Sequence, residues 1–339
     1  MKPFKILHIG RKENYLRNTP KNDFTDSVTI ISLPIGRPVA DYVNAMPDAD
    51  VIFADAIADI PGELIQALPN LKMIHSEGVA FNSFDVAAAG RRGIYVCNCA
   101  GMNGEAVAEQ TLMLMLGVLH DAVNNDRAVR EARQQKVKEG YMVRGDLKSL
   151  EDCKVGLIGF GHIGQCTAAL LKACHAETFY TQRHRAPEDL EQQCQVTWVP
   201  TQDELLAACD IVSLHLPVTP ETKNMCDEAF FNKMKPGSYF INTSRGELVD
   251  DEALVNALKS GRLTMAGLDT LDHEPVQKDH MLLHLPEDIA KKIFFSPHIG
   301  GITRSSFRKG YAMIWSDTQK IAEGKEPDHV VNQKFLVKK

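Results

Sequence analysis

The sequence lacks the features that would place it in or across a membrane. Its longest apolar stretches, such as Leu112 to Leu119, are far shorter than the ~20 residues of a membrane-spanning helix. The N-terminal run MKPFKILHIG passes from a short basic start directly into a strand-like segment, without the apolar core of a secretory signal peptide. We therefore expect a cytoplasmic protein that has no membrane partner.

The eight cysteines form no CxxC pair, the spacing that is typical of zinc and redox sites. Cys97 and Cys99 are two residues apart, which places both on one face of a strand, but no His or Cys partners follow at zinc-site spacing. This pattern favours free thiols in a reducing compartment over a disulfide framework. We expect no metal site.

Basic residues are concentrated nowhere except at residues 183–185. The net charge is −6 and the isoelectric point is near 6.1, so we expect no nucleic-acid partner. No solenoid-type repeat and no low-complexity tract interrupts the sequence. A chain of 339 residues is long enough for about two domains, each with its own core.

Short apolar strands alternate with helical stretches from end to end, which predicts α/β architecture with parallel sheets. The chain should cross between two α/β domains near 99–103 and again near 295–300, with a cleft between the domains. The clearest early helix is 61–68, and a long helix is expected over 105–133, with apolar residues from Val107 to Leu119 on one face. The expected strands are 5–9, 28–33, 50–54, 73–76, 94–99, 154–159, 177–181, 211–216, 238–242, 265–269 and 293–296.

A glycine motif follows the apolar run 155–158 and opens a helical stretch. In this context Gly159 permits a tight turn, Gly161 lets a pyrophosphate approach the backbone, and Gly164 allows close packing of helix on strand. The free N–H groups at the helix start, which includes His162 and Ile163, attract phosphate. The motif predicts a dinucleotide site rather than a chance cluster of glycines.

The end of the next strand favours NADP(H) over NAD(H). An NAD site usually has an acidic residue there for the ribose 2′-hydroxyl, whereas this chain has Gln182 followed by Arg183, His184 and Arg185. A carboxylate would repel a 2′-phosphate, while the two arginines could bind it. The alternative is a solvated turn before Pro187.

Three polar residues follow later strands, at the carboxyl ends where open α/β sheets carry functional groups. Arg245 has a planar fork that suits a carboxylate, although a surface ion pair with Glu247 or Asp250 is the alternative. His298 follows the strand at 293–296 and is one of twelve histidines, so its type alone does not single it out. Glu274 could accept a ring N–H of a catalytic histidine and stabilise the imidazolium.

Four linked motifs occur in one order along the chain. The glycine motif at 159–164 is followed by INTSRGELVD at 241–250, AGLDTLDHEP at 266–275 and SPHIGG at 296–301. Together they resemble the D-isomer-specific 2-hydroxyacid dehydrogenases, over roughly residues 69–332. The segment NGEAVAE at 103–109 is similar to the one that opens the long helix of that family.

The resemblance implies a fold, an oligomer and residue roles. It implies two doubly wound parallel-sheet domains, with a Rossmann dinucleotide domain (102–298) inserted into a discontinuous flavodoxin-like substrate domain (1–101 and 299–339), and a homodimer. It makes His298 the acid and base, Glu274 its orienting partner and Arg245 the substrate anchor. It places further residues along the cofactor, namely Val107, Leu216, Pro217, Thr222, Thr243, Ser244, Asp269 and Gly300.

In that family a glycine-containing loop binds the substrate carboxylate through backbone N–H groups, and the corresponding run here is 77–82. The chain departs from the family pattern, with Ala80 where a glycine is usual and Asn82 where an aspartate is frequent. Val79 and Ala80 are the expected substrate-binding positions.

The implied activity is hydride transfer between NAD(P)H and a small 2-oxo or D-2-hydroxy acid. The motifs are closest to those of glyoxylate and hydroxypyruvate reductases and phosphoglycerate dehydrogenases. The alternatives are a dinucleotide-sensing binding protein like the C-terminal binding protein corepressors, or a catalytically idle relative.

Overall fold

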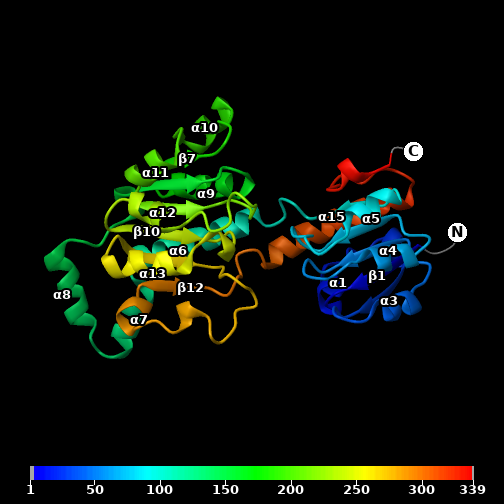
Figure 1. The fold of residues 1–339 in the computed structure, drawn as a ribbon, viewed down its shortest axis with the longest axis horizontal. Coiled ribbons are helices and arrows are strands. Elements are labelled where there is room, and N and C mark those ends of the chain that lie inside the picture. Colours follow the sequence, from blue (N-terminus) through cyan, green and yellow to red (C-terminus); the bar gives the residue numbers. More distant parts are fainter. Residues whose placement is uncertain (1–3, 338–339) are drawn as a thin grey trace. The chain divides into compact units, whose positions relative to one another are not determined.

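The computed structural model describes residues 4–337 and divides them into two compact units. Residues up to Asn103 and from Ile302 onward form unit 1, and Gly104–Gly301 form unit 2. The boundaries expected from the sequence, 101/102 and 298/299, fall beside these. Each unit is a parallel sheet covered by helices, as Figure 1 shows, so the predicted class of two parallel-sheet α/β domains is confirmed.

Unit 1 has a five-stranded sheet in the order β2-β1-β3-β4-β5, and every pair of neighbouring strands is parallel. Helices α3 to α5 bury one apolar face of this sheet, while α1, α2 and the returning helix α15 bury the other. Burial on both faces explains why the strands are apolar almost throughout. The elements are β1 Lys5–Ile9, α1 Lys12–Asn18, α2 Asp23–Ser27, β2 Thr29–Leu33, α3 Val39–Ala45, β3 Val51–Ala54, α4 Gly62–Ala67, β4 Met73–Ser76, α5 Val86–Arg91, β5 Tyr95–Cys97 and α15 Arg304–Ala322.

Unit 2 has a seven-stranded parallel sheet in the order β12-β11-β10-β9-β6-β7-β8. Strand order reverses between β6 and β9, and ligands of doubly wound sheets bind outside the carboxyl ends of strands at such a point. Helices α6 and α9 cover one face, and α11 to α13 cover the other. The elements are α6 Gly104–Leu119, α7 Ala122–Arg130, α8 Gln134–Arg144, β6 Lys154–Ile158, α9 His162–Ala173, β7 Glu177–Thr181, α10 Glu188–Cys194, β8 Val196–Trp198, α11 Gln202–Ala208, β9 Ile211–Leu214, α12 Glu228–Lys233, β10 Ser238–Asn242, α13 Asp251–Ser260, β11 Leu263–Leu268, α14 Glu287–Ala290 and β12 Ile293–Phe295.

The expected helix over 105–133 is wrong in length. It ends as α6 at Leu119, and Asp121 takes a left-handed conformation (φ 47°) before α7 begins. Regular α-helix cannot continue through such a residue. Helix α8 and the edge strand β8 were not among the elements expected from the sequence.

No single described helix is both long and apolar enough to cross a membrane. Taken together, the bent pair α6 and α7 has the length and the apolar composition of a membrane span, and nothing beyond length and composition supports that interpretation.

Candidate active site

The three glycines after β6 have the geometry that a dinucleotide loop requires. Gly159 has a φ of +96°, and a Cβ there would lie 2.4 Å from the carbonyl oxygen of His215. A Cβ on Gly164 would lie 2.7 Å from the Gly159 carbonyl oxygen, whereas a Cβ on Gly161 would meet nothing within 4 Å. The first and third glycines therefore serve the turn and the packing, and the second leaves open space for a phosphate.

Helix α9 begins at His162 with Gly161 as its N-cap, and no side chain caps it. The first N–H groups of the helix, from His162 to Gly164, therefore remain available to an anion. Gly104 at the start of α6 lies against the His162 ring, since a Cβ there would come within 2.3 Å of it. Val107, one turn into α6, is buried. Burial lowers the pKa of His215, next to the loop, to about 4, so this ring is neutral at neutral pH.

Gln182 closes the glycine loop from the end of β7. Its Oε1 accepts from the Phe160 amide at 3.2 Å, and its Nε2 donates to the His184 carbonyl at 2.7 Å. No acidic side chain stands at this position. Arg183 is exposed and forms no ion pair with the described residues, although its charge helps to lower the pKa of Glu221. The fixed Gln182 and the unpaired cation after it are compatible with a 2′-phosphate.

Arg185 is engaged elsewhere. Its guanidinium binds both carboxylate oxygens of Glu191, at 3.0 and 2.7 Å, and lies over the ring of Trp198. Glu191 is buried and also accepts from Tyr180 Oη at 2.5 Å. Removing Arg185 would leave a buried carboxylate short of a partner, so we attribute to it a structural role. The sequence alone did not separate Arg183 from Arg185.

Arg245 follows β10 and is exposed. Its Nη1 donates to the Ser244 carbonyl at 2.7 Å, and within residues 4–337 no carboxylate lies at ion-pair distance from it. The alternative of a surface ion pair with Glu247 or Asp250 is therefore wrong; the Asp250 carboxylate instead caps α13. Most of the guanidinium fork remains available for a ligand.

The Arg245 loop and the Glu274 loop are in close backbone contact. A Cβ on Gly246 would lie 1.9 Å from the carbonyl carbon of Leu271, so only glycine fits between the loops. Because β10, β11 and β12 are neighbours in the sheet, Arg245, Glu274 and His298 leave it at the same edge.

His298 and Glu274 are in direct contact. The Nδ1 atom of His298 is hydrogen-bonded to Oε2 of Glu274, and Oε1 of the same carboxylate accepts from the Leu271 amide at 3.1 Å. An ionised carboxylate only accepts, so Nδ1 carries a hydrogen and Nε2 is the atom that can gain and lose a proton. The His298 side chain is 42% exposed, which leaves Nε2 accessible.

The loop that carries His298 is fixed by one buried carboxylate. Asp269 accepts from the amides of Ile299 (3.1 Å) and Gly300 (3.0 Å), and its own carbonyl accepts from the His298 amide at 2.8 Å. These bonds hold His298 at a φ of +53°, a region that non-glycine residues rarely occupy. Asp269 therefore positions His298, and this role does not depend on a contact between Asp269 and the cofactor.

The remaining predicted cofactor residues lie at the ends of β9 and β10, beside the switch in strand order. The hydroxyls of Thr243, Ser244 and Thr222 are used internally: Thr243 with Thr111 (2.8 Å), Ser244 with the Leu214 carbonyl (2.7 Å) and Thr222 with the Pro217 carbonyl (2.8 Å). Leu216 is partly buried and Pro217 is exposed. Their contacts with a cofactor stay predictions.

In unit 1 the loop after β4 presents two free amides. The carbonyl of Val79 accepts from Asn98 Nδ2 and that of Ala80 from Ser76 Oγ, both at 2.7 Å. Their N–H groups have no hydrogen-bond partner among the described residues. Ala80 is absent from the residues with positive φ, so alanine in place of glycine causes no backbone strain here.

Several positioning residues were not predicted from the sequence. Asn242 bridges the turn after β10, because its amide donates to the Arg245 carbonyl and its oxygen accepts from the Ser244 amide. Gln110 of α6 donates to Ser296, which in turn donates to Asp269. Asn242 and Ser296 could have been found from the sequence, because each is a polar residue at the end of an apolar strand. Gln110 has no such feature in the sequence.

Comparison with known proteins assigns the chain to a family. Residues 112–300 match the model of the D-isomer specific 2-hydroxyacid dehydrogenase NAD-binding domain. The chain is 33% identical over 295 residues to glyoxylate reductase of Thermofilum pendens (85% of this chain, 83% of that protein) and 32% identical over 307 residues to that of Thermococcus litoralis (89% of each). The apo structure of D-mandelate dehydrogenase from Rhodotorula graminis superposes with a TM-score of 0.82 at 25% identity, covering 98% of both chains. With a dinucleotide loop and a paired histidine and glutamate already in place, these matches establish that the chain belongs to the D-isomer-specific 2-hydroxyacid dehydrogenase family of NAD(P)-dependent oxidoreductases.

Proposed function

We propose that this protein reduces a small 2-oxo acid of the glyoxylate or hydroxypyruvate type to the 2-hydroxy acid. The observation that carries the proposal is the contact between His298 and Glu274, which leaves an accessible Nε2. The substrate class is supported by the relatives named glyoxylate reductase. A nicotinamide bound at the glycine loop would supply the hydride.

His298 transfers the proton in the proposed reaction. In its protonated form, Nε2 donates to the carbonyl oxygen of the substrate as the carbonyl carbon receives the hydride, and in the reverse direction Nε2 takes the hydroxyl proton. Glu274 stabilises the imidazolium through Nδ1 and fixes the ring plane. Asp269 holds the backbone of the histidine loop, so the acid is positioned before substrate binds.

Two kinds of hydrogen-bond donor are available to bind a substrate carboxylate. The free guanidinium of Arg245 can bind it through two parallel hydrogen bonds. The amides of Val79 and Ala80, whose carbonyls are both held in place, offer two further donors. We propose Arg245 as the carboxylate anchor of unit 2, and Val79 and Ala80 as the substrate-binding donors of unit 1.

The reaction is tested by nicotinamide absorbance, crossing NADPH and NADH with glyoxylate, hydroxypyruvate, pyruvate and a bulkier 2-oxo acid. The small acids should be turned over fastest. Negligible turnover of every 2-oxo acid, by a protein that still binds NADPH, would overturn the proposal and point to a dinucleotide-sensing or idle relative.

We further propose that NADP(H) is preferred over NAD(H), with Arg183 binding the 2′-phosphate. Replacing Arg183 with alanine should lower the NADPH/NADH ratio of kcat/KM about 10- to 100-fold, because a charge-assisted hydrogen bond contributes about 1.5–3 kcal/mol. Arg185→Ala is the matched control: it should reduce Tm, through the loss of the Glu191 pair, and leave the ratio within about threefold. A ratio unaffected by Arg183→Ala contradicts this assignment.

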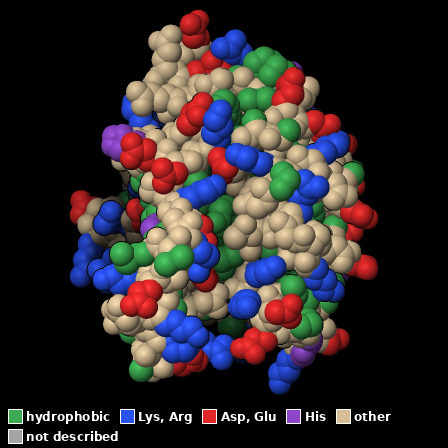
Figure 2. Space-filling model, turned by 90° about the vertical axis from the view of Figure 1, so that its left-hand side faces the viewer, with side chains coloured by type: hydrophobic (Ala, Val, Ile, Leu, Met, Phe, Trp, Pro, Cys, Tyr) green, Lys and Arg blue, Asp and Glu red, His purple; other side chains and the backbone are tan. Residues whose placement is uncertain are grey.

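We propose a homodimer that uses the surface of α7 and α8. This surface exposes Val129, Met142, Val143 and Leu147 by 56, 73, 87 and 46%. Figure 2 turns toward the viewer the side of unit 2 on which Figure 1 labels α7 and α8. Clustered exposed apolar side chains are typical of protein interfaces. Light scattering should give twice the chain mass, and Val143→Asp should shift the protein to monomer. A wild-type monomer at micromolar concentration would refute the dimer.

A cytoplasmic location is also part of the proposal. None of the eight cysteines forms a disulfide, and six of them are buried. Free thiols in this number suit a reducing compartment. Cell fractionation tests this directly, and recovery of the protein outside the cytoplasmic fraction would contradict it.

A further inference from the structure

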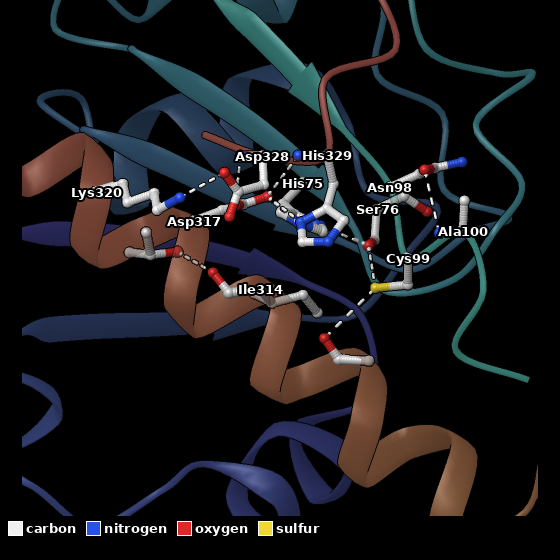
Figure 3. A network of polar contacts seen from close by, with 12 residues as sticks. His75, Ser76, Asn98, Cys99, Ala100, Ile314, Asp317, Lys320, Asp328 and His329 are labelled. Carbon is white, nitrogen blue, oxygen red and sulfur yellow. Dashed lines mark hydrogen bonds and ion pairs between the residues drawn. The ribbon is translucent and has the colours of Figure 1, made fainter. Parts of the chain in front are cut away.

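A buried cluster of possible metal ligands lies in unit 1, outside the residues assigned to catalysis. His75 of β4 and Cys97 of β5 are direct cross-strand neighbours, and Asp317 comes from α15. One ligand atom from each lies within 4.8 Å of the other two, and all three residues are fully buried. Figure 3 shows Asp317 pointing from α15 toward the rings of His75 and His329.

The hydrogen bond on the far side of the His75 ring fixes its tautomer. Nδ1 lies 2.8 Å from the carbonyl oxygen of Ser76, which can only accept, so Nδ1 carries the hydrogen. In the neutral ring, Nε2 then presents a lone pair to the interior. This atom is buried and has no hydrogen-bond partner among the described residues, although it lies 3.3 Å from Oδ2 of Asp317.

Both oxygens of the Asp317 carboxylate are held by hydrogen bonds. Oδ1 accepts from the Asp328 amide at 2.9 Å, and Oδ2 accepts from the His329 amide at 3.4 Å and lies 2.9 Å from His329 Nδ1. A carboxylate and an imidazole lone pair therefore face each other in a dry interior. Such a pair is unfavourable unless a positive charge lies between the two atoms.

A proton on Nε2 would supply that charge and make the two groups an ion pair. An imidazolium next to a carboxylate forms a short charge-assisted hydrogen bond of about 2.7–2.9 Å. Here the two atoms are 3.3 Å apart and do not meet hydrogen-bond geometry. Ligands around a tetrahedral zinc ion lie about 3.3–3.7 Å from one another, as bond lengths of about 2.0–2.3 Å require.

We propose that His75, Cys97 and Asp317 bind a zinc ion that fastens α15 to strands β4 and β5. Nitrogen, sulfur and oxygen ligands together are typical of zinc. The Nδ1–H bond to a backbone carbonyl is the usual support of a zinc-bound histidine, and the bond from His329 orients the carboxylate. Two anionic ligands, the Cys97 thiolate and Asp317, neutralise the ion.

Zinc must displace the thiol proton of Cys97, so the affinity for zinc should fall as the pH is lowered. The His329 side chain, 28% exposed, marks the route to solvent. Ligands from three distant segments leave no local spacing pattern, so the sequence predicted no metal site.

The full-length protein, expressed with zinc in the medium, tests the site by metal analysis. Wild type should contain about one zinc per chain, and Cys97→Ala and Asp317→Asn should each lose at least nine-tenths of it. Cys99→Ala is the matched control, because Cys99 is equally buried two residues away. Cys166→Ala controls for the exposed group of Glu105, His162 and Cys166. Both controls should retain the zinc.

Cobalt supplies a second readout that is independent of activity. After chelation, Co²⁺ should give wild type a thiolate-to-cobalt charge-transfer band that Cys97→Ala lacks, and chelation should lower the wild-type Tm by about 5 °C or more. If wild type takes up neither zinc nor cobalt, or if Cys97→Ala and Asp317→Asn bind both metals as wild type does, the proposal is wrong. The wild-type result decides this even if a variant fails to fold.

Discussion

Replacing His298 with alanine should lower kcat for 2-oxo acid reduction by about a hundredfold to ten-thousandfold, the range that a lost general acid accounts for. The loss should fall on kcat rather than on cofactor binding, because His298 lies after β12 while the glycine loop follows β6. Stopped-flow or steady-state absorbance gives kcat, and fluorescence titration gives the Kd for NADPH.

His284→Ala is the matched control for that change. His284 is another exposed histidine of unit 2, whose Nε2 lies 2.6 Å from the Lys278 carbonyl oxygen, and its replacement should leave kcat unchanged. The kcat of Glu274→Gln should lie between the kcat values of His298→Ala and His284→Ala. The amide oxygen still accepts from Nδ1 but no longer stabilises the imidazolium by charge. Unaltered turnover in His298→Ala would remove the histidine from the mechanism.

Replacing Arg245 with alanine should lower kcat/KM for the 2-oxo acid by about 30- to 1,000-fold, mostly through KM. Two charge-assisted hydrogen bonds to a carboxylate contribute on the order of 2–4 kcal/mol. No described ion pair of the folded protein depends on Arg245, so stability should change little. Arg245→Lys should recover only part of the loss, because a point charge does not reproduce the planar fork.

The substrate itself provides the control for Arg245. A neutral carbonyl compound without a carboxylate should be reduced poorly by wild type and no worse by Arg245→Ala. An equal fold loss on the charged and neutral substrates would show that Arg245 acts on the site as a whole rather than on the carboxylate.

The parts of the site made by backbone geometry were the most predictable from sequence. Gly159, Gly161 and Gly164 each have the surroundings that the motif implies, since only glycine fits the positive φ of the first and the close contact of the third. The strands were predictable for a similar reason: burial on both faces makes them apolar throughout. Boundaries and breaks were not, as the turn at Asp121 shows, because apolar periodicity continues on both sides of it.

Side-chain pairings were the least predictable. Arg183 and Arg185 look equivalent in sequence, and only the placement of Glu191 on α10 separates their roles. Ala80 looked like a possible defect in the substrate loop, but its backbone angles suit any residue. Gln110 reaches Ser296 across a long sequence separation that no local pattern encodes. Tertiary contacts decide each of these cases.

The order of the two units along the chain has a consequence for biosynthesis. The first ninety-seven residues include all five strands of unit 1, but α15, which covers one face of their sheet, is translated only after the whole of unit 2. At about 5–20 residues per second, the ~200 intervening residues take about 10–40 s to emerge from the ribosome. During that interval Ile6, Val51 and Phe53 belong to an apolar surface that is still without its helix. The nascent chain is therefore most in need of a chaperone after its first domain, and not its last, has been made.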